Sequence, residues 1–338
     1  MNHPIKTFDS LPQASRVSAP LRGVASPEPR AVPLVGVIRN PRSFRNKGLA
    51  PEQAAHAEVI TETALKRNDL FEVLARFASA GIDYLAIDGG DGTVRDVLTW
   101  GDSVFGDDWP PLIVLPKGKT NALAADLGLS PQWELARAIE LASAGSFARR
   151  RALVVAEADD PQARVQGFML GAGVFTRSIS LGQSAHRWGA FNSLAVVVTT
   201  FWTLAQAFFA GGGNPWRQLF GIRLTDEGGK PFPGDPEQRY IVLSSTLENF
   251  PMGLKPFGAV RAALKLAMLD RPWRKSLLRV PAIAFGRRPR NSERLGYHWV
   301  APDSYLMTLD DRFILDGEAF PPGAYRVSLG PELRFVVP

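Results

Sequence analysis

Short apolar runs alternate with amphipathic stretches along the first half of the chain. The runs at 34–38, 84–87 and 112–115 are each followed within three residues by glycine or proline, as is typical of buried strands. Apolar spacing and terminal glycines predict helices over 51–80, with a break near 68–69, over 94–100, over 121–127 and from 131 to 144. This alternation predicts a parallel sheet that is covered by helices on both faces.

The pattern changes after the arginine run at 149–151. Glycine and proline clusters then separate short β-rich segments, which predict strands at 152–156, 167–170, 218–224, 240–244, 305–309, 325–329 and 333–337. Such segments are typical of an antiparallel sandwich or barrel.

The predicted fold class is therefore α/β plus β. We expect an α/β/α domain with a parallel sheet over residues 32–150 and a β-sandwich-like domain over 151–338, whose last strands can return to the first domain. Residues 1–31 contain five prolines and no apolar period, which predicts a disordered tail.

One long uncharged segment, residues 190–210, raises the question of a membrane span. It is about long enough to cross a bilayer, but it includes Asn192, Gln206 and several serines and threonines. These polar side chains favour a buried or membrane-facing amphipathic helix over a true span.

Composition removes several classes of chemistry. The 338 residues include no cysteine, which excludes disulfides, thiolate zinc sites, iron–sulfur clusters and cysteine nucleophiles. The four histidines lie far apart and form no metal-ligand spacing, so hydrolysis built on histidine is not expected. The formal net charge of +6 suits anionic lipid, nucleotide phosphate and nucleic acid equally.

The first motif with clear chemistry is DGGDGT, residues 88–93, which follows a predicted strand and precedes a predicted helix. Glycines there let the backbone approach a phosphate, and the helix directs N–H groups and its positive dipole end to the same point. Thr93 is expected to cap that helix. Asp91 is informative because an anion in a phosphate site normally holds magnesium or accepts a proton. The alternative is a plain glycine-rich turn.

A second motif, PKGKTN at residues 116–121, repeats this arrangement one strand later. Lys117, Lys119 and Thr120 converge on one helix start, where Thr120 is expected to act as a cap, and Asn121 can bond phosphate or ribose. Parallel strands end at the same edge of a sheet, so both loops are expected to line one crevice. A solvated strand–helix loop is the alternative for this motif alone.

A third motif, LDGE at residues 315–318, lies in the predicted β-rich domain. One of its carboxylates can accept a proton while the other anchors a metal or its water. Taken alone, an acidic β-turn is the simpler interpretation.

Together with Asn40-Pro41 after the first predicted strand, these motifs resemble the catalytic family of diacylglycerol and sphingosine kinases. The similarity runs over about residues 33–338 and includes the segment GKTNALA at 118–124. A motif like GGDGT also occurs in NAD kinases and phosphofructokinases. The late Asp-Gly-Glu on a β-rich second domain distinguishes the lipid kinases from both.

The resemblance implies a kinase that uses ATP and Mg²⁺ to phosphorylate a hydroxyl group of a diacylglycerol-like or sphingoid lipid. It implies a nucleotide-binding first domain and ATP between the two domains. Separately, the apolar but partly polar character of the 190–210 helix predicts that the lipid chain lies between that helix and the second-domain sheet. Asp91 would serve catalysis and hold the metal, and Asp316 or Glu318 would accept the hydroxyl proton. The residues expected to hold ATP are Asn40, Gly89, Gly90, Gly92, Thr93, Gly118, Lys119, Thr120 and Asn121.

The chain departs from the family pattern at three places. Phe44 follows Ser43 where the family usually has glycine, and Ala122 stands where bacterial diacylglycerol kinases usually have aspartate. Arg271 follows Asp270 where bacterial members often have the glycine of a structural magnesium site, so a second metal is not predicted.

Two other functions stay open, a soluble NAD-kinase-like enzyme and a non-catalytic lipid-binding relative. The basic clusters at 149–151, 273–275 and 287–290 can attract an anionic membrane, although solvated faces explain them equally well. The expected partners are a lipid substrate and an anionic membrane surface, without nucleic acid, at a cytoplasmic and peripheral location. The sequence selects neither the lipid, nor the oligomeric state, nor which of Asp316 and Glu318 is the base.

Overall fold

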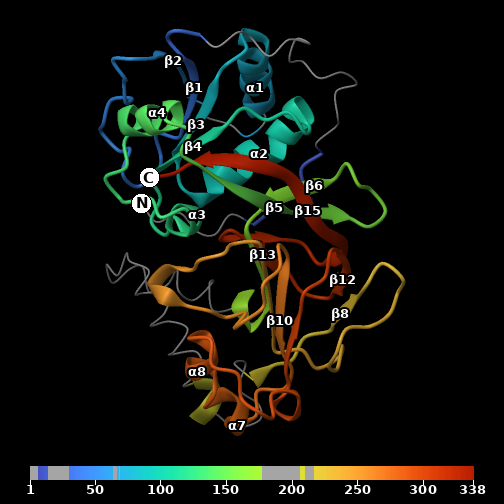
Figure 1. The fold of residues 1–338 in the computed structure, drawn as a ribbon. Coiled ribbons are helices and arrows are strands. Elements are labelled where there is room, and N and C mark those ends of the chain that lie inside the picture. Colours follow the sequence, from blue (N-terminus) through green and yellow to red (C-terminus); the bar gives the residue numbers. More distant parts are fainter. Residues whose placement is uncertain (1–6, 14–29, 64–66, 68, 177–205, 210–216) are drawn as a thin grey trace. The chain divides into compact units, whose positions relative to one another are not determined.

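The structure, a computed structural model, describes residues 7–13, 30–63, 67, 69–176, 206–209 and 217–338 (Figure 1). The chain forms two compact units. Unit 1 comprises Met1–Leu11, Leu153–Arg164 and Phe168–Leu329, and unit 2 comprises Pro12–Ala152, Val165–Gly167 and Gly330–Pro338. Two long strands, β5 (Phe147–Glu157) and β15 (Gly323–Val336), have residues in both units.

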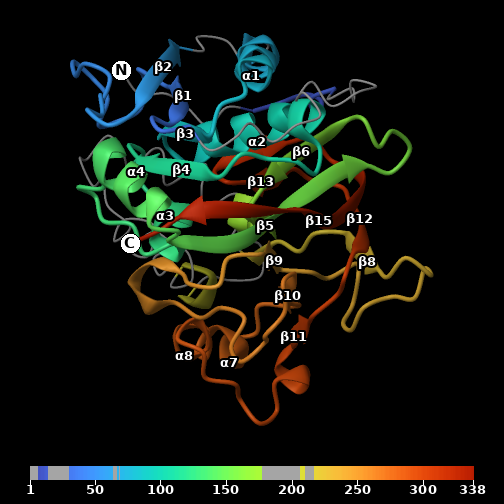
Figure 2. The ribbon, with the colours of Figure 1, turned by 45° about the horizontal axis from the view of Figure 1, so that its top comes forward.

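Unit 2 contains a parallel sheet with the strand order β2-β1-β3-β4 (Figure 2). Its strands are β1 (Leu34–Arg39), β2 (Glu58–Thr63), β3 (Tyr84–Gly89) and β4 (Leu112–Pro116). The end of β15 adds a further parallel neighbour, with Phe335 opposite Leu112. Strands β1 and β4 are buried along their whole length, which explains why their sequences are almost entirely apolar.

Four helices pack on this sheet, namely α1 (Asp69–Ala80), α2 (Asp91–Phe105), α3 (Ala122–Asp126) and α4 (Leu135–Ser143). Phe77 of α1 packs against Gly36 of β1, where a Cβ atom would lie 2.8 Å from the ring. Helix α2 was predicted to end at Gly101, but it continues through this residue. Glycine is needed there for packing and not as a helix end, because a Cβ atom would collide with the Trp109 ring. The helix ends at Gly106, whose φ of 54° stops it.

The helix predicted over residues 51–80 is correct only in its second half. Residues 58–63 form β2, which pairs in parallel with β1 from Leu34 to Arg39. The segment is rich in β-branched residues, and pairing with a buried strand outweighs its weak helical spacing.

Unit 1 is built from antiparallel strands. One sheet has the order β11-β10-β9-β7-β13-β14, formed by β7 (Met169–Gly173), β9 (Ile241–Ser245), β10 (Lys265–Leu269), β11 (Tyr297–Val300), β13 (Phe313–Leu315) and β14 (Glu318–Phe320). Elsewhere β12 (Tyr305–Leu309) pairs with β8 (Ile222–Thr225) and with β15, and β5 pairs with β15 and β6 (Arg164–Gly167). The predicted fold class, α/β plus β, is confirmed.

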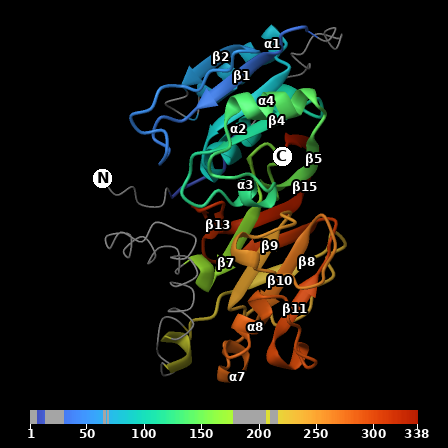
Figure 3. The same cartoon turned by 60° about the vertical axis from the view of Figure 1, so that its left-hand side comes forward.

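Two strands that were predicted separately near the C-terminus form one continuous strand. Residues 325–329 and 333–337 belong to the single strand β15, which runs through Gly330 and Pro331. Pro331 lies between Val327, which pairs with β12, and Phe335, which pairs with β4. The short helices of unit 1 are η3 (Pro251–Gly253), α7 (Arg274–Leu277), α8 (Val280–Ala284) and η4 (Glu293–Leu295), with α7 and α8 side by side (Figure 3).

Part of the predicted disordered tail is ordered. The Phe8 N–H donates to the carbonyl of Ala319 at 2.9 Å, and its ring stacks on Phe320 with centroids 5.0 Å apart. Leu11 is buried as well. Two isolated apolar residues among prolines carry no periodicity, so the sequence pattern did not reveal this packing.

The predicted helix over residues 190–210 lies outside the described residues except for 206–209. The lipid-binding position predicted along this helix therefore also lies outside them. Among the residues that the structure describes, no helix combines the length and the hydropathy that a membrane span requires.

Candidate functional site

The two glycine motifs of unit 2 meet at one edge of the parallel sheet. Gly89, at the end of β3, pairs with Pro116 at the end of β4. One residue further on, the loops touch, because a Cβ atom on Gly90 would lie 2.8 Å from the Cα of Gly118. Only glycine fits on either side of this contact. The structure therefore brings the predicted ATP-binding loops together.

Helix α2 begins at Asp91, directly after the extended residue Gly90. The first N–H groups of an α-helix have no partner within the helix, so this start presents donors to an anion. The prediction that Thr93 caps the helix is wrong because the helix begins two residues earlier. The Thr93 hydroxyl instead accepts a hydrogen bond of 2.9 Å from the Asn40 side-chain amide.

Asp91 links the two loops. Its carboxylate accepts the backbone N–H groups of Ala122 at 3.0 Å and Leu123 at 3.4 Å, which start α3. Burial raises the pKa of the Asp91 carboxyl group, although these backbone hydrogen bonds act in the opposite direction. The helix start that Thr120 was predicted to cap is therefore capped by Asp91 from the neighbouring loop.

The second loop is shaped by Asn121, which has a left-handed backbone with φ of 52°. Its side chain accepts the N–H of Gly118 at 2.8 Å and donates to the carbonyl of the same residue at 3.0 Å. Lys119 and Thr120, at the tip of this loop, are both exposed. Among the predicted ATP-binding residues, Asn121 is thus part of the loop framework.

Lys117 does not converge on the helix start with Lys119 as predicted. Its ammonium group forms an ion pair with the carboxylate of Glu52. The other oxygen of Glu52 accepts the N–H of Leu135 at 2.7 Å, at the start of α4. Glu52 lies in a segment predicted as helix, so its role here was missed.

A buried ion pair supports the loop that carries Asn40. Arg39 donates to the Asp88 carboxylate at 3.0 Å, and Asn46 donates to its other oxygen at 2.9 Å. Asn46 also donates to the carbonyl of Asn40 at 3.0 Å. Burial raises the pKa of Asp88 despite the Asn46 hydrogen bond and the Arg39 charge.

Sequence reasoning missed Arg39 and Asn46, although one signal was present. Arg39 is the last residue of β1 and Asp88 is the next-to-last residue of the adjacent parallel strand β3, and the two face one another in the register. Both strands were predicted from the sequence, and the opposite charges that directly follow the two predicted runs could have indicated an ion pair.

The third motif lies in unit 1 and forms the turn between β13 and β14. Asp316 and Gly317 have φ values of 46° and 84°, as a type I′ hairpin turn requires. The Asp316 carboxylate accepts the N–H groups of Phe168 and Met169, both at 3.0 Å. Glu318 is the first residue of β14, opposite Leu315. The two acidic residues therefore have different surroundings, with Asp316 engaged in holding the turn.

Asp270 lies beside Arg239 and His298. Its carboxylate accepts hydrogen bonds from Arg239 at 2.7 Å and lies 3.0 Å from His298 Nε2. Among the described residues, no group of three or more acidic or histidine side chains could hold a metal ion. Mg²⁺ usually takes one or two carboxylates and completes its shell with phosphate and water. Asp91 fits that requirement as a single carboxylate at the start of α2, beside the two glycine loops.

These loops on a parallel sheet give unit 2 the architecture of phosphate-binding α/β proteins. Residues 35–152 match the family model of the diacylglycerol kinase catalytic domain. This match confirms the resemblance that the motifs indicated.

Solved structures share the fold of most of this chain. A "putative diacylglycerol kinase" from Bacillus anthracis str. Sterne superposes with a TM-score of 0.64 at 14% identity, covering 92% of this chain and 99% of its own. A structure described as a diacylglycerol kinase from the same organism has a TM-score of 0.61, with the same identity and coverage. No curated protein matches the chain by sequence.

Proposed function

We propose that this protein is an ATP-dependent lipid kinase that transfers the γ-phosphoryl group of ATP to a hydroxyl group of a diacylglycerol-like or sphingoid lipid. The observation that carries the proposal is the backbone contact between Gly90 and Gly118, within the segment that matches the diacylglycerol kinase catalytic domain. Phosphoryl transfer depends mainly on positioning and on charge stabilisation, and two glycine loops at one helix start are suited to both.

In this proposal the ATP phosphates bind at the start of α2. Gly89 and Gly90 let Thr93 and the second loop pack closely at this point, and Gly92 lies in the first turn of the helix. Asn40 and Thr93 fix one wall through their mutual hydrogen bond. Lys119 and Thr120 come from the second loop, which Asn121 shapes. Lys117 contributes indirectly, because its pairing with Glu52 ties the second loop to the start of α4.

Asp91 has two tasks in this scheme. It holds the second loop by accepting the N–H groups of Ala122 and Leu123, and its remaining lone pairs provide the protein ligand for Mg²⁺. When bound, the metal neutralises charge on the transferred phosphoryl group.

We assign the proton acceptor to Glu318 and a positioning role to Asp316. As the lipid hydroxyl oxygen bonds to the γ-phosphorus, the bond from phosphorus to the ADP oxygen breaks and the hydroxyl proton passes to the Glu318 carboxylate. Asp316 holds the turn through two backbone N–H groups, which leaves it less suited to accept a proton. The chain would act at the cytoplasmic face of a membrane as a peripheral protein.

The test is phosphorylation of a panel of acceptors. Purified protein is incubated with γ-labelled ATP and Mg²⁺, together with mixed micelles of diacylglycerol or sphingosine, or with NAD in solution. The proposal expects label in a lipid and none in NAD. Labelled NAD would identify a soluble small-molecule kinase, and no labelled product with any acceptor would favour a non-catalytic lipid-binding protein.

A further inference from the structure

Unit 1 carries a group of exposed apolar side chains around α7 and α8. They include every large hydrophobic side chain that is exposed among the described residues of unit 1: Phe209 (80%), Met252 (48%), Trp273 (51%), Leu278 (65%) and Phe285 (54%). A contiguous apolar patch on a soluble protein usually marks a binding surface. We call this group, with the cations that surround it, the apolar–basic surface.

The helix α7 is fixed to unit 1 by its other side. Ser276 and Leu277 are buried, the Ser276 hydroxyl donates to the carbonyl of Leu295 at 2.7 Å, and the Tyr297 hydroxyl donates to the carbonyl of Ser276 at 2.7 Å. Trp273 and Leu278 flank this anchored pair and are exposed. The apolar side chains are therefore presented by a firmly attached element.

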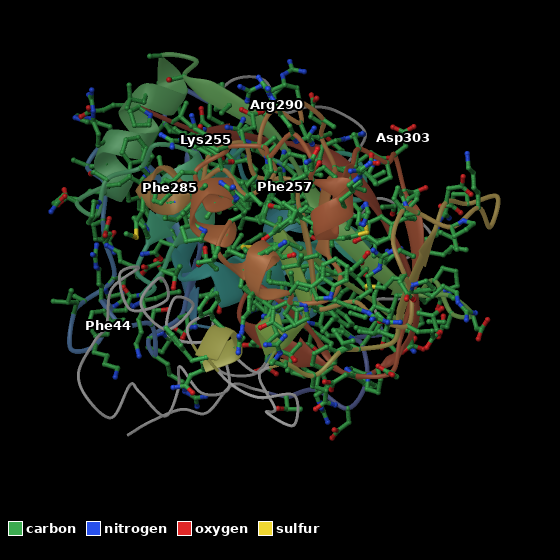
Figure 4. The ribbon with its side chains drawn as sticks, turned by 90° about the horizontal axis from the view of Figure 1, so that it is seen from below. Phe44, Lys255, Phe257, Phe285, Arg290 and Asp303 are labelled. Carbon is green, nitrogen blue, oxygen red and sulfur yellow. The ribbon has the colours of Figure 1, made fainter. Side chains whose placement is uncertain are left out.

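Hydrogen bonds join the separate segments of the apolar–basic surface. The Lys255 N–H, just after η3, donates to the carbonyl of Ala284 at 2.6 Å, so that Lys255 lies beside Phe285 (Figure 4). Arg217 donates to the carbonyls of Ala207 at 3.3 Å and Pro272 at 3.1 Å. The segments that carry Met252 and Phe285 are therefore joined by a hydrogen bond, and those that carry Phe209 and Trp273 are joined through Arg217.

The charge of the stretch that carries α7 and α8 has one sign. No acidic residue occurs between Arg271 and Ser292. The exposed cations in this stretch are Arg271, Arg274, Lys275, Arg279, Arg287, Arg288 and Arg290, and Lys255 adds another. Exposed aromatic and aliphatic side chains within a field of cations are the combination that binds at the interface of an anionic bilayer.

We propose that the apolar–basic surface docks unit 1 on an anionic lipid bilayer. Trp273, Leu278 and Phe285 would enter the headgroup region, and the arginines and lysines would pair with lipid phosphates. A nucleic acid would satisfy the cations, but it would offer no burial for Met252 and Leu278. This inference concerns binding alone and does not depend on the kinase activity.

The test is sedimentation of the full chain with vesicles, without ATP and without an acceptor lipid. Vesicles of phosphatidylcholine are compared with vesicles that also contain phosphatidylglycerol. We expect binding to the anionic vesicles only, and we expect salt to weaken it. Equal binding to both vesicles, or binding to neither at low salt, would overturn the proposal.

Variants locate the surface. Arg274→Gln with Lys275→Gln should weaken vesicle binding about 25-fold, since each cation near the surface contributes about fivefold. Trp273→Ser with Phe285→Ser should weaken it at least about tenfold. Exposed Lys230→Gln and Val32→Ser, outside this surface, are the matched controls and should leave binding unchanged. Equal losses in the controls, or full binding by both double variants, would contradict the assignment.

Discussion

The side-chain amide of Asn40 donates a hydrogen bond of 2.9 Å to the Thr93 hydroxyl and so joins the end of β1 to the first turn of α2. The Asn40 backbone is held as well, because its N–H donates to the carbonyl of Asp88 at 3.0 Å. Asn40 and Thr93, which the sequence predicted separately as ATP-binding residues, thus form one hydrogen-bonded pair.

The hydrogen bond between Asn40 and Thr93 predicts that substitutions of these two residues have non-additive effects on ATP binding. Asn40→Ala and Thr93→Val should each weaken binding about fivefold to tenfold, the scale of one hydrogen bond. The loss of ATP-binding free energy in the double variant should be smaller than the sum of the losses in the two single variants, with a coupling energy of about 1 kcal/mol. Titration calorimetry with ATP measures all four corners of this cycle. Strict additivity would show that the pair does not act as a unit toward the nucleotide.

The contact between the two glycine loops predicts a severe effect of a single methyl group. In Gly118→Ala the new Cβ would lie 2.7 Å from the Cα of Gly90 and 2.6 Å from Asn121 Oδ1, so the loops must separate. ATP affinity should fall at least about tenfold, as expected when phosphate donors are displaced. Gly228→Ala, whose Cβ would meet only Asp226 Oδ1 at 3.3 Å, is the control. Normal ATP affinity in Gly118→Ala would argue against phosphate binding between these loops.

The buried pair of Arg39 and Asp88 predicts a loss of stability. Their side chains are 6% and 1% exposed, so Asp88→Asn leaves an uncompensated buried cation. The free energy of unfolding should fall by about 3 kcal/mol. Arg137→Gln breaks the exposed pair with Glu140 and should cost less than about 1 kcal/mol. Urea denaturation measures both, and equal losses would contradict the role given to burial.

The raised pKa of Asp91 predicts a pH dependence that Asp91→Asn removes. The ionised carboxylate is the form that can hold a metal, so activity should fall as the pH decreases through a value above that of an ordinary aspartate. At neutral pH, Asp91→Asn should lower kcat at least about 100-fold.

The same group affects stability with the opposite sign. Because the folded state binds the Asp91 proton more tightly than the unfolded state does, the free energy of unfolding decreases as the pH rises from the ordinary value through the raised one. Denaturation of the wild type and of Asp91→Asn across this window should show a shallower decrease in the variant. An identical pH dependence in both proteins would exclude Asp91 as the source.

Asp316 and Glu318 should separate into a stability residue and a catalytic one. Asp316→Ala leaves the N–H groups of Phe168 and Met169 without their acceptor, and should lower the free energy of unfolding by about 1–3 kcal/mol. Glu318→Gln should keep stability and ATP affinity but lower kcat at least about 100-fold. Full activity in Glu318→Gln, together with inactivity in a stable Asp316→Asn, would exchange the two roles.

The sequence predicted those elements whose signal is local. The strands β1, β3 and β4 contain apolar runs, and the two glycine motifs begin at the ends of β3 and β4. Parallel strand ends share one sheet edge, which is why the meeting of Gly90 and Gly118 could be expected.

What the sequence did not reveal depends on partners far along the chain. Residues 58–63 form strand β2 because they pair with the buried strand β1. Lys117 forms an ion pair with Glu52, which is distant in the sequence but adjacent in the fold. The sequence indicated Asp91 as a catalytic residue and metal ligand, and its role in capping α3 emerges only when the two loops are adjacent. Phe8 has no periodic neighbours that would indicate its stacking on Phe320.

The most direct test of the account is the fate of the phosphoryl group of ATP. Mixed micelles of diacylglycerol or sphingosine are incubated with the protein and Mg²⁺, once with γ-labelled and once with α-labelled ATP, and the extracted lipid is counted. The account predicts lipid label from the γ-labelled nucleotide only, and its loss in Asp91→Asn. Hydrolysis of ATP without lipid label, or lipid label that persists unchanged in Asp91→Asn, would contradict it.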